Sequence, residues 1–251
     1  MEYGAYSHKG LHRKSNEDYY YIPNNERSGP NIIIVADGMG GHNAGELASR
    51  MTVEYISSYF LEHFSQIHTT DELINAMHQS IQDVNNRAFI LSGTDENLSG
   101  MGTTLTMAVF WEDKVHVAHV GDSRCYLLSD NKVKQITRDH SLVQELLDNG
   151  SITRDEMDIH PKKNVITRAL GTEDRLKIDC FEETVTDGDT ILLCTDGLIN
   201  YINVEVYGKD IPSDISVEKL VEILGNEALT AGGADDITVV AARYSSEREK
   251  R

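Results

Sequence analysis

Short apolar runs joined by very short connections constrain the fold of this chain more than any other feature. The runs 103–111 and 114–120 are separated by only two acidic residues. Parallel strands need a crossover of a dozen or more residues, so a two-residue connection requires an antiparallel pair. A second pair of runs, 124–128 and 133–136, is separated by a turn-forming Ser-Asp-Asn-Lys sequence and predicts another hairpin.

Further runs predict the remaining elements. β-Branched or apolar runs predict strands at 31–36, 190–194 and 237–242. Apolar residues at helical spacing predict helices over 44–59, 73–88 (with Asp71 as its N-cap), 142–147 and 217–224. Two long helices followed by a strand meander do not alternate as βαβ units would. This order predicts an α+β fold in which helices pack on the outside of antiparallel sheets.

Composition excludes several classes of function. The 251 residues carry 23 Lys and Arg against 41 Asp and Glu, a net charge of −18, so neither nucleic acid nor an anionic membrane is expected as a partner. No signal peptide or membrane-spanning run is expected, and three scattered cysteines are typical of a reduced cytoplasmic protein. Because no linker or repeat divides the chain, we predict one domain over 1–244 and a polar tail over 245–251.

Four aspartates stand at or just beyond strand ends, beside small or turn-forming residues: Asp37, Asp122, Asp196 and Asp235. Any one of them could be simple turn chemistry. Four together, at the ends of apolar strands, predict a carboxylate cluster that would repel itself without cations. Hard oxygen ligands favour magnesium or manganese, and two such ions about 4 Å apart can activate water for phosphoryl transfer.

A second group of polar residues lies near the N-terminus. Arg13 is followed by Asn16, Glu17 and Asp18. The planar fork of an arginine matches phosphate oxygens, and the two acids could orient metal-bound water. Taken alone, this pattern is equally compatible with a solvated loop.

Six motifs in order resemble those of the metal-dependent protein phosphatases, the PPM or type 2C family, and above all its compact bacterial serine/threonine members. The motifs are Arg13-x-x-Asn16-Glu17-Asp18, Asp37-Gly38-Met39-Gly40-Gly41-His42, Gly100-Met101-Gly102-Thr103-Thr104, Gly121-Asp122-Ser123-Arg124, Thr195-Asp196-Gly197 and Gly233-x-Asp235. The resemblance covers roughly residues 6 to 242. It implies a central sandwich of two antiparallel β-sheets flanked by helices, with a flap at about 139–171.

The resemblance also implies site roles and a reaction. Asp37 would bridge two Mn²⁺ or Mg²⁺ ions, Asp196 and Asp235 would bind the first ion, and the Gly38 carbonyl would bind the second. Asp122 together with Asp196 would bind a third, weaker ion. Glu17 and Asp18 would act through metal-bound water, and Arg13 would bind the substrate phosphate. A metal-bridging water or hydroxide would directly attack phosphoserine and phosphothreonine monoesters. The implied partners are phosphoserine and phosphothreonine proteins, which are substrates of a Ser/Thr kinase, and that kinase itself. We expect the protein to be a monomer.

Two positions depart from the family pattern. Many eukaryotic members have histidine directly after the Asp-Gly pair, whereas this chain has Met39 there and His42 three residues on. His42 is a candidate proton donor to the leaving alkoxide, with a plain loop histidine as the alternative. The family usually has asparagine after the last metal aspartate, but this chain has Asp236. Asp236 could support a metal ligand from behind or contribute a ligand itself.

Two other functions remain as alternatives. One is a different two-metal hydrolase, such as a phosphodiesterase or nuclease, but the basic groove that it would need is not evident at a net charge of −18. The other is a catalytically silent module that binds phosphoproteins. The presence of Arg13 together with all four aspartates disfavours that reading.

Overall fold

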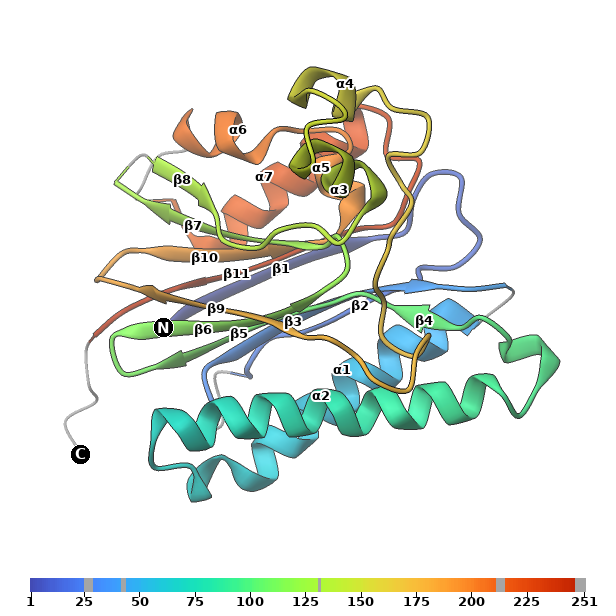
Figure 1. The fold of residues 1–251 in the computed structure, drawn as a ribbon. Helices are drawn as coiled ribbons and strands as arrows, with labels where there is room; N and C mark the ends of the chain where they lie inside the picture. The colour runs from blue at the N-terminus through green and yellow to red at the C-terminus, as the bar shows by residue number, and fades with distance from the viewer. Residues whose placement is uncertain (25–28, 42–43, 131, 211–214, 247–251) are drawn as a thin grey trace.

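Two antiparallel sheets stacked face to face form the centre of the molecule (Figure 1). The structure is a computed structural model and describes residues 1–24, 29–41, 44–130, 132–210 and 215–246. The first sheet has the strand order β1 (Glu2–His8), β11 (Ile237–Arg243), β10 (Thr190–Cys194), β7 (Arg124–Ser129), β8 (Lys132–Gln135). The second has the order β2 (Asp18–Tyr21), β3 (Ile32–Met39), β5 (Leu105–Trp111), β6 (Lys114–Val120), β9 (Asp179–Thr184), with β4 (Gly102–Thr103) beside β3.

Helices cover both outer faces, and each layer is sealed by its own apolar cluster. The long helices α1 (Ala44–His63) and α2 (Thr70–Ser92) pack on the second sheet through residues such as Phe60 and Ile81. The helices α5 (Asp196–Ile199) and α7 (Val217–Thr230) pack on the first sheet. A third cluster fills the space between the sheets. The predicted α+β sandwich with flanking helices is confirmed.

Both predicted hairpins are present, but the second turn is shorter than predicted, because Ser129 and Lys132 pair as strand residues. Trp111 pairs with Lys114 across the turn between β5 and β6. Glu112, within that turn, has a φ of 56°. Asp130, in the turn between β7 and β8, has a φ of 47°. Both lie in the left-handed region, which is where the tightest hairpin turns place their central residues.

The start of α2 differs from the sequence prediction. Asp71 is not the N-cap, because Thr69 takes that position and its hydroxyl accepts from the Glu72 amide. The Glu72 carboxylate in turn accepts from the Thr69 amide, which completes a capping box. Ser141 caps the short helix α3 (Leu142–Asp148) in a similar way. The remaining helices are α4 (Arg154–Asp158) and α6 (Val204–Asp210).

The loops that carry the candidate site residues emerge at one end of the sandwich. His8, the last residue of β1, pairs with Ile237, the first of β11, and β10 ends beside them. In the second sheet, the end of β3 lies beside the start of β2. Within the described ranges, no helix has the length and hydropathy needed to cross a membrane.

Candidate active site and metal centre

Strand β3 delivers Asp37 and Gly38 to this end of the sandwich. The Asp37 amide donates to the Thr104 hydroxyl at 2.9 Å, and the Asp37 carbonyl accepts from the Thr104 amide and the Thr103 hydroxyl, both at 2.8 Å. Gly38 is enclosed by backbone, since a Cβ there would lie 2.1 Å from the Gly45 carbonyl oxygen. Only glycine fits this position, so the backbone that carries Asp37 is fixed from both sides.

Asp18 lies opposite Asp37 on the neighbouring strand. The side chain is buried, and its Oδ2 accepts from the Thr195 hydroxyl at 2.8 Å. The other carboxylate oxygen, Oδ1, is buried and has no hydrogen-bond partner among the residues that the structure describes. A buried carboxylate oxygen without a donor is costly, and a cation is the natural partner for it.

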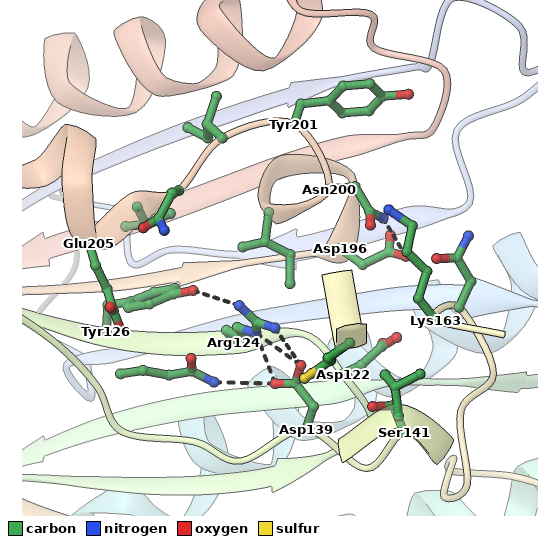
Figure 2. A pocket seen from close by; sticks show the side chains of 18 of the residues that line it. Asp122, Arg124, Tyr126, Asp139, Ser141, Lys163, Asp196, Asn200, Tyr201 and Glu205 are labelled. Carbon is green, nitrogen blue, oxygen red and sulfur yellow. Dashed lines mark hydrogen bonds and ion pairs between the residues drawn. The ribbon is translucent and has the colours of Figure 1, made fainter. Parts of the chain in front are cut away.

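Asp196 and Asp122 share a polar cavity of about 300 Å³ (Figure 2). Asp196 is the first residue of α5, and its Oδ2 accepts from the Asn200 amide group at 3.1 Å. Asp122 lies in the β6–β7 turn and is buried. Figure 2 shows Lys163 reaching across the cavity from the opposite wall toward Asp196 and Asn200.

Buried ion pairing shapes the floor of the same cavity. Arg124 donates Nε and Nη2 to Asp139, at 2.6 to 3.0 Å, in a bidentate pair (Figure 2). Its Nη1 reaches the hydroxyl of Tyr126 at 3.3 Å. Asp139 is buried and Arg124 half-buried, and their bidentate pair holds the strand that follows Asp122 against the start of the segment 139–171.

Arg13 and Asp235 complete the site from two further loops. The Nη2 atom of Arg13 lies 2.5 Å from Oδ1 of Asp235, and its Nη1 lies 3.7 Å from the Glu17 carboxylate. Asp235 immediately precedes Asp236 and strand β11. The side chain of Arg13 is 43% exposed, so a ligand from solvent can reach it.

The electrostatics show that these carboxylates face one another. Burial raises the pKa of Asp37 well above its ordinary value, and nearby negative charges raise it further, namely those of Asp18, Asp196, Asp122 and Asp235. Burial also raises the pKa of Asp18, Asp122 and Asp196, each with help from a neighbouring carboxylate. Holding so many anions together is unfavourable unless cations neutralise them.

The carboxylate oxygens of the site have the ligand chemistry that divalent cations such as Mn²⁺ and Mg²⁺ prefer. Among the described residues, no three His, Cys, Asp or Glu side chains are already spaced to hold one ion. Asp235 is instead engaged by Arg13, and Asp196 by Asn200. The unpartnered oxygen of Asp18 and the mutual repulsion around Asp37 are the two features that cations would relieve.

Comparison with known proteins identifies the family. The family model described as protein phosphatase 2C matches residues 8–231. This chain belongs to the protein phosphatase 2C family. The serine/threonine phosphatase stp of Listeria welshimeri is 39% identical over 232 residues, which cover 92% of this chain and 91% of that protein.

Solved phosphatase 2C structures agree with the fold. A serine/threonine phosphatase of S. agalactiae superposes with a TM-score of 0.89 at 32% identity, over 97% of this chain and 99% of that one. The catalytic domain of the serine/threonine protein phosphatase PstP, solved in complex with two manganese ions, superposes with a TM-score of 0.81 at 33% identity, over 96% of each chain.

The structure gathers most of the site residues predicted from the phosphatase 2C motifs at one end of the sandwich. His42 lies outside the described residues. Sequence reasoning missed Asn200 and Thr195, which hold Asp196 and Asp18 respectively. The spacing of Asp196 and Asn200, four residues apart on a helix, was a usable signal for the first. Nothing local marks the second, since Thr195 and Asp18 are 177 residues apart.

Proposed function

We propose that this chain is a metal-dependent serine/threonine phosphoprotein phosphatase that hydrolyses phosphate monoesters. The observation that carries the proposal is the convergence of buried Asp18 with half-buried Asp37 and Asp196 beside the exposed guanidinium of Arg13. Family membership and the relatives named as serine/threonine phosphatases support the substrate class.

Each residue of the site has a defined task in this proposal. Asp37, Asp196, Asp235 and the Gly38 carbonyl would hold two Mn²⁺ or Mg²⁺ ions, and Asp122 with Asp196 would hold a third, weaker one. When bound, the ions lower the pKa of water and neutralise phosphoryl oxygens for direct, in-line attack. Glu17 and Asp18 orient water next to the ions. Arg13 binds the substrate phosphate and stabilises the charge on the transferring group.

The leaving alkoxide needs a proton, and His42 stays the predicted donor. An Ala substitution at His42 is expected to lower kcat for an alkyl phosphoserine peptide more than for p-nitrophenyl phosphate, whose leaving group needs no protonation. Equal losses of kcat on both substrates would mean that His42 is not the proton donor and would favour the alternative of a plain loop histidine.

We further propose that the domain spans 1–244 and that the segment 139–171 is a flap over the substrate. This segment supplies one wall of the cavity in Figure 2, including Asp139, Ser141 and Lys163. Its base is tied to the sheet, because Leu170 pairs with Thr103 next to the strand that carries Asp37. A phosphopeptide entering the cavity would therefore contact both the flap and the metal ligands.

The biological setting follows from the same proposal. The enzyme would act in the cytoplasm as a monomer, in signalling, on proteins phosphorylated by a Ser/Thr kinase and on the kinase itself. The net charge of −18 would repel anionic phosphoproteins at long range, so recognition would depend on the local positive charge of Arg13 and the bound cations.

The direct test is phosphate release from a phosphothreonine peptide with Mn²⁺, with and without EDTA. An Asn substitution at Asp37 removes one negative charge from the centre of the cluster and is expected to lower kcat/KM by at least about 10²-fold. Asp189→Asn changes a buried carboxylate that only caps the turn before β10, so its activity should match that of the wild type. Full activity of the Asp37 variant would refute the role of Asp37.

The same assay separates the alternatives. Cyclic nucleotides and single-stranded DNA test the phosphodiesterase and nuclease readings, because both substrates are phosphodiesters. Their hydrolysis at rates comparable to the phosphopeptide would replace the proposed function. A failure to release phosphate from the peptide, together with tight peptide binding, would favour the silent binding module.

A further inference from the structure

Asp236 holds both ends of the segment 10–17, which carries Arg13. Its Oδ1 accepts from the Gly10 amide at 2.9 Å, and its Oδ2 accepts from the Glu17 amide at 2.8 Å. The residue is 3% exposed. Each carboxylate oxygen therefore closes one end of the loop, and neither contact involves another side chain.

The loop also lies directly on the backbone before β11. The Leu11 amide donates to the Gly233 carbonyl at 2.8 Å. A Cβ at Gly10 would lie 2.5 Å from the Asp235 carbonyl oxygen, so the two backbones are in close contact. Arg13 itself extends beyond this contact, and its amide donates to the Gly10 carbonyl at 3.0 Å.

Consecutive aspartates thus have separate tasks. The Asp235 side chain faces the guanidinium of Arg13, whereas the Asp236 side chain faces the main chain of the loop. The guanidinium is partly exposed, and its ion pairs within the described part of the chain are with the carboxylates of Asp235 and Glu17. Since its own contacts lie in the ion-binding cluster, the position of Arg13 on the substrate side depends on the loop that carries it.

We propose that Asp236 is the positioning residue for Arg13: its carboxylate fixes the loop so that the guanidinium meets the substrate phosphate. The proposal rests on the proposed phosphatase function and assigns Asp236 a role in phosphate binding in place of ion binding. A carboxylate offers acceptors on both oxygens, which the two amide donors require. Asparagine has a single acceptor atom, so it can satisfy only part of this arrangement.

The test uses the full-length Mn²⁺-loaded enzyme and the variants Asp236→Ala and Asp236→Asn. Loss of both contacts in the Ala variant is expected to raise KM for a phosphothreonine peptide, and the inhibition constant of inorganic phosphate, about tenfold or more. The kcat value should change less than about threefold. The Asn variant, which keeps one acceptor and nearly the same volume, should fall between the Ala variant and the wild type.

Two further measurements show whether Asp236 acts through Arg13. In an Arg13→Ala background, Asp236→Ala should change kcat/KM by less than about twofold, because the group being positioned is gone. Calorimetric titration should give the same Mn²⁺ affinity for the Asp236 variants as for the wild type. Asp189→Ala removes another buried carboxylate that accepts from a backbone amide, and it should leave KM unchanged.

Three results would overturn the inference. They are a folded Asp236→Ala protein with wild-type KM, a full effect of that substitution in the Arg13→Ala background, and weakened Mn²⁺ binding in the Asp236 variants. If the Asp236→Ala variant does not fold, the Asp236→Asn variant is the test, and a wild-type KM of that variant would contradict the proposed role of Asp236. Absence of phosphatase activity in the wild type is a separate outcome and rejects the proposed function itself.

Discussion

At the scale of single residues, the end of the molecule that carries the site depends on positions where only one residue type fits. Gly38 is the clearest case, because a Cβ would overlap the carbonyl oxygens of Gly45 and Glu17. The same residue donates its amide to the Glu17 carbonyl at 3.0 Å. A glycine here therefore lets three backbone segments approach one another and brings Asp37 next to the loop of Arg13.

Replacing Gly38 with alanine is expected to destabilise the fold by about 1–3 kcal/mol, because the added methyl group must displace backbone. Chemical denaturation would measure the loss. Phosphatase activity should fall as well, since Asp37 shifts with its neighbour. Gly41→Ala is the matched control, because a Cβ there meets nothing within 4 Å. Equal stability of the two variants would contradict this account.

At the scale of an element, strand β6 places a titratable group inside the sandwich. His119 is fully buried, its Nδ1 lies 2.9 Å from the Thr106 hydroxyl, and its ring centroid lies 4.8 Å from that of His140. Its Nε2 is buried, and none of the described residues forms a hydrogen bond with it. Burial, together with the His140 charge, lowers the pKa of His119 from 6.5 to about 3.

This shift predicts a pH dependence of stability. Below pH 6.5 the unfolded chain binds a proton at His119 that the folded chain does not, so stability is lost as pH falls from 6.5 toward 3. The contribution approaches about 1.4 kcal/mol per pH unit. In EDTA, the free energy of unfolding of His119→Gln should fall less between pH 6.5 and 5 than that of the wild type. An equal fall in the two proteins would contradict this account.

Sequence patterns predicted the elements with strong apolar periodicity and missed those without it. The run of apolar residues in β10 and the two-residue turn before β6 are both recognisable in the sequence. Strand β9 does not, because its sequence alternates partly buried with exposed positions and is rich in acidic residues. Strand β1 contains a glycine and two tyrosines, and its place beside β11 depends on pairs such as Glu2 with Arg243 and His8 with Ile237, at opposite ends of the sequence.

The candidate site shows the same division. Asp37, Asp122, Asp196 and Asp235 could be predicted because each lies near the end of an apolar strand, Asp37 within the last residues of β3 and the others just outside a strand. The roles of Thr195 and Asp236 could not, because their partners, Asp18 and the amides of Gly10 and Glu17, come from the opposite end of the chain. Such contacts are set by the sandwich as a whole and leave no local pattern.

At the scale of the whole molecule, the site joins the two sheets. Asp18 and Asp37 belong to the second sheet, whereas Asp196 and Asp235 adjoin strands of the first. Ions held by both sets would connect the sheets in the folded chain and find no such site in the unfolded one. Metal binding should therefore stabilise the entire domain.

Mn²⁺ at about 100 times its Kd is expected to add about 2.7 kcal/mol, which corresponds to a rise in Tm of about 5–10 °C for a domain of this size. Thermal scans with Mn²⁺ and with EDTA would measure it. The rise should largely disappear in Asp37→Asn, whereas NaCl at matched ionic strength should not reproduce it in the wild type. A wild-type shift in the Asp37 variant would place the binding ions elsewhere.

The position of β11 has a consequence for synthesis of the protein. This strand lies between β1 and β10, so the first sheet keeps a gap until one of the last segments arrives. Asp235 and Asp236 directly precede β11. Its pairing therefore brings in a predicted ion ligand, Asp235, together with the carboxylate of Asp236 that binds the Gly10 and Glu17 amides of the Arg13 loop. A nascent chain whose β11 is still inside the ribosome would therefore be inert toward phosphoproteins, and the enzyme would become active only after β11 has emerged and paired.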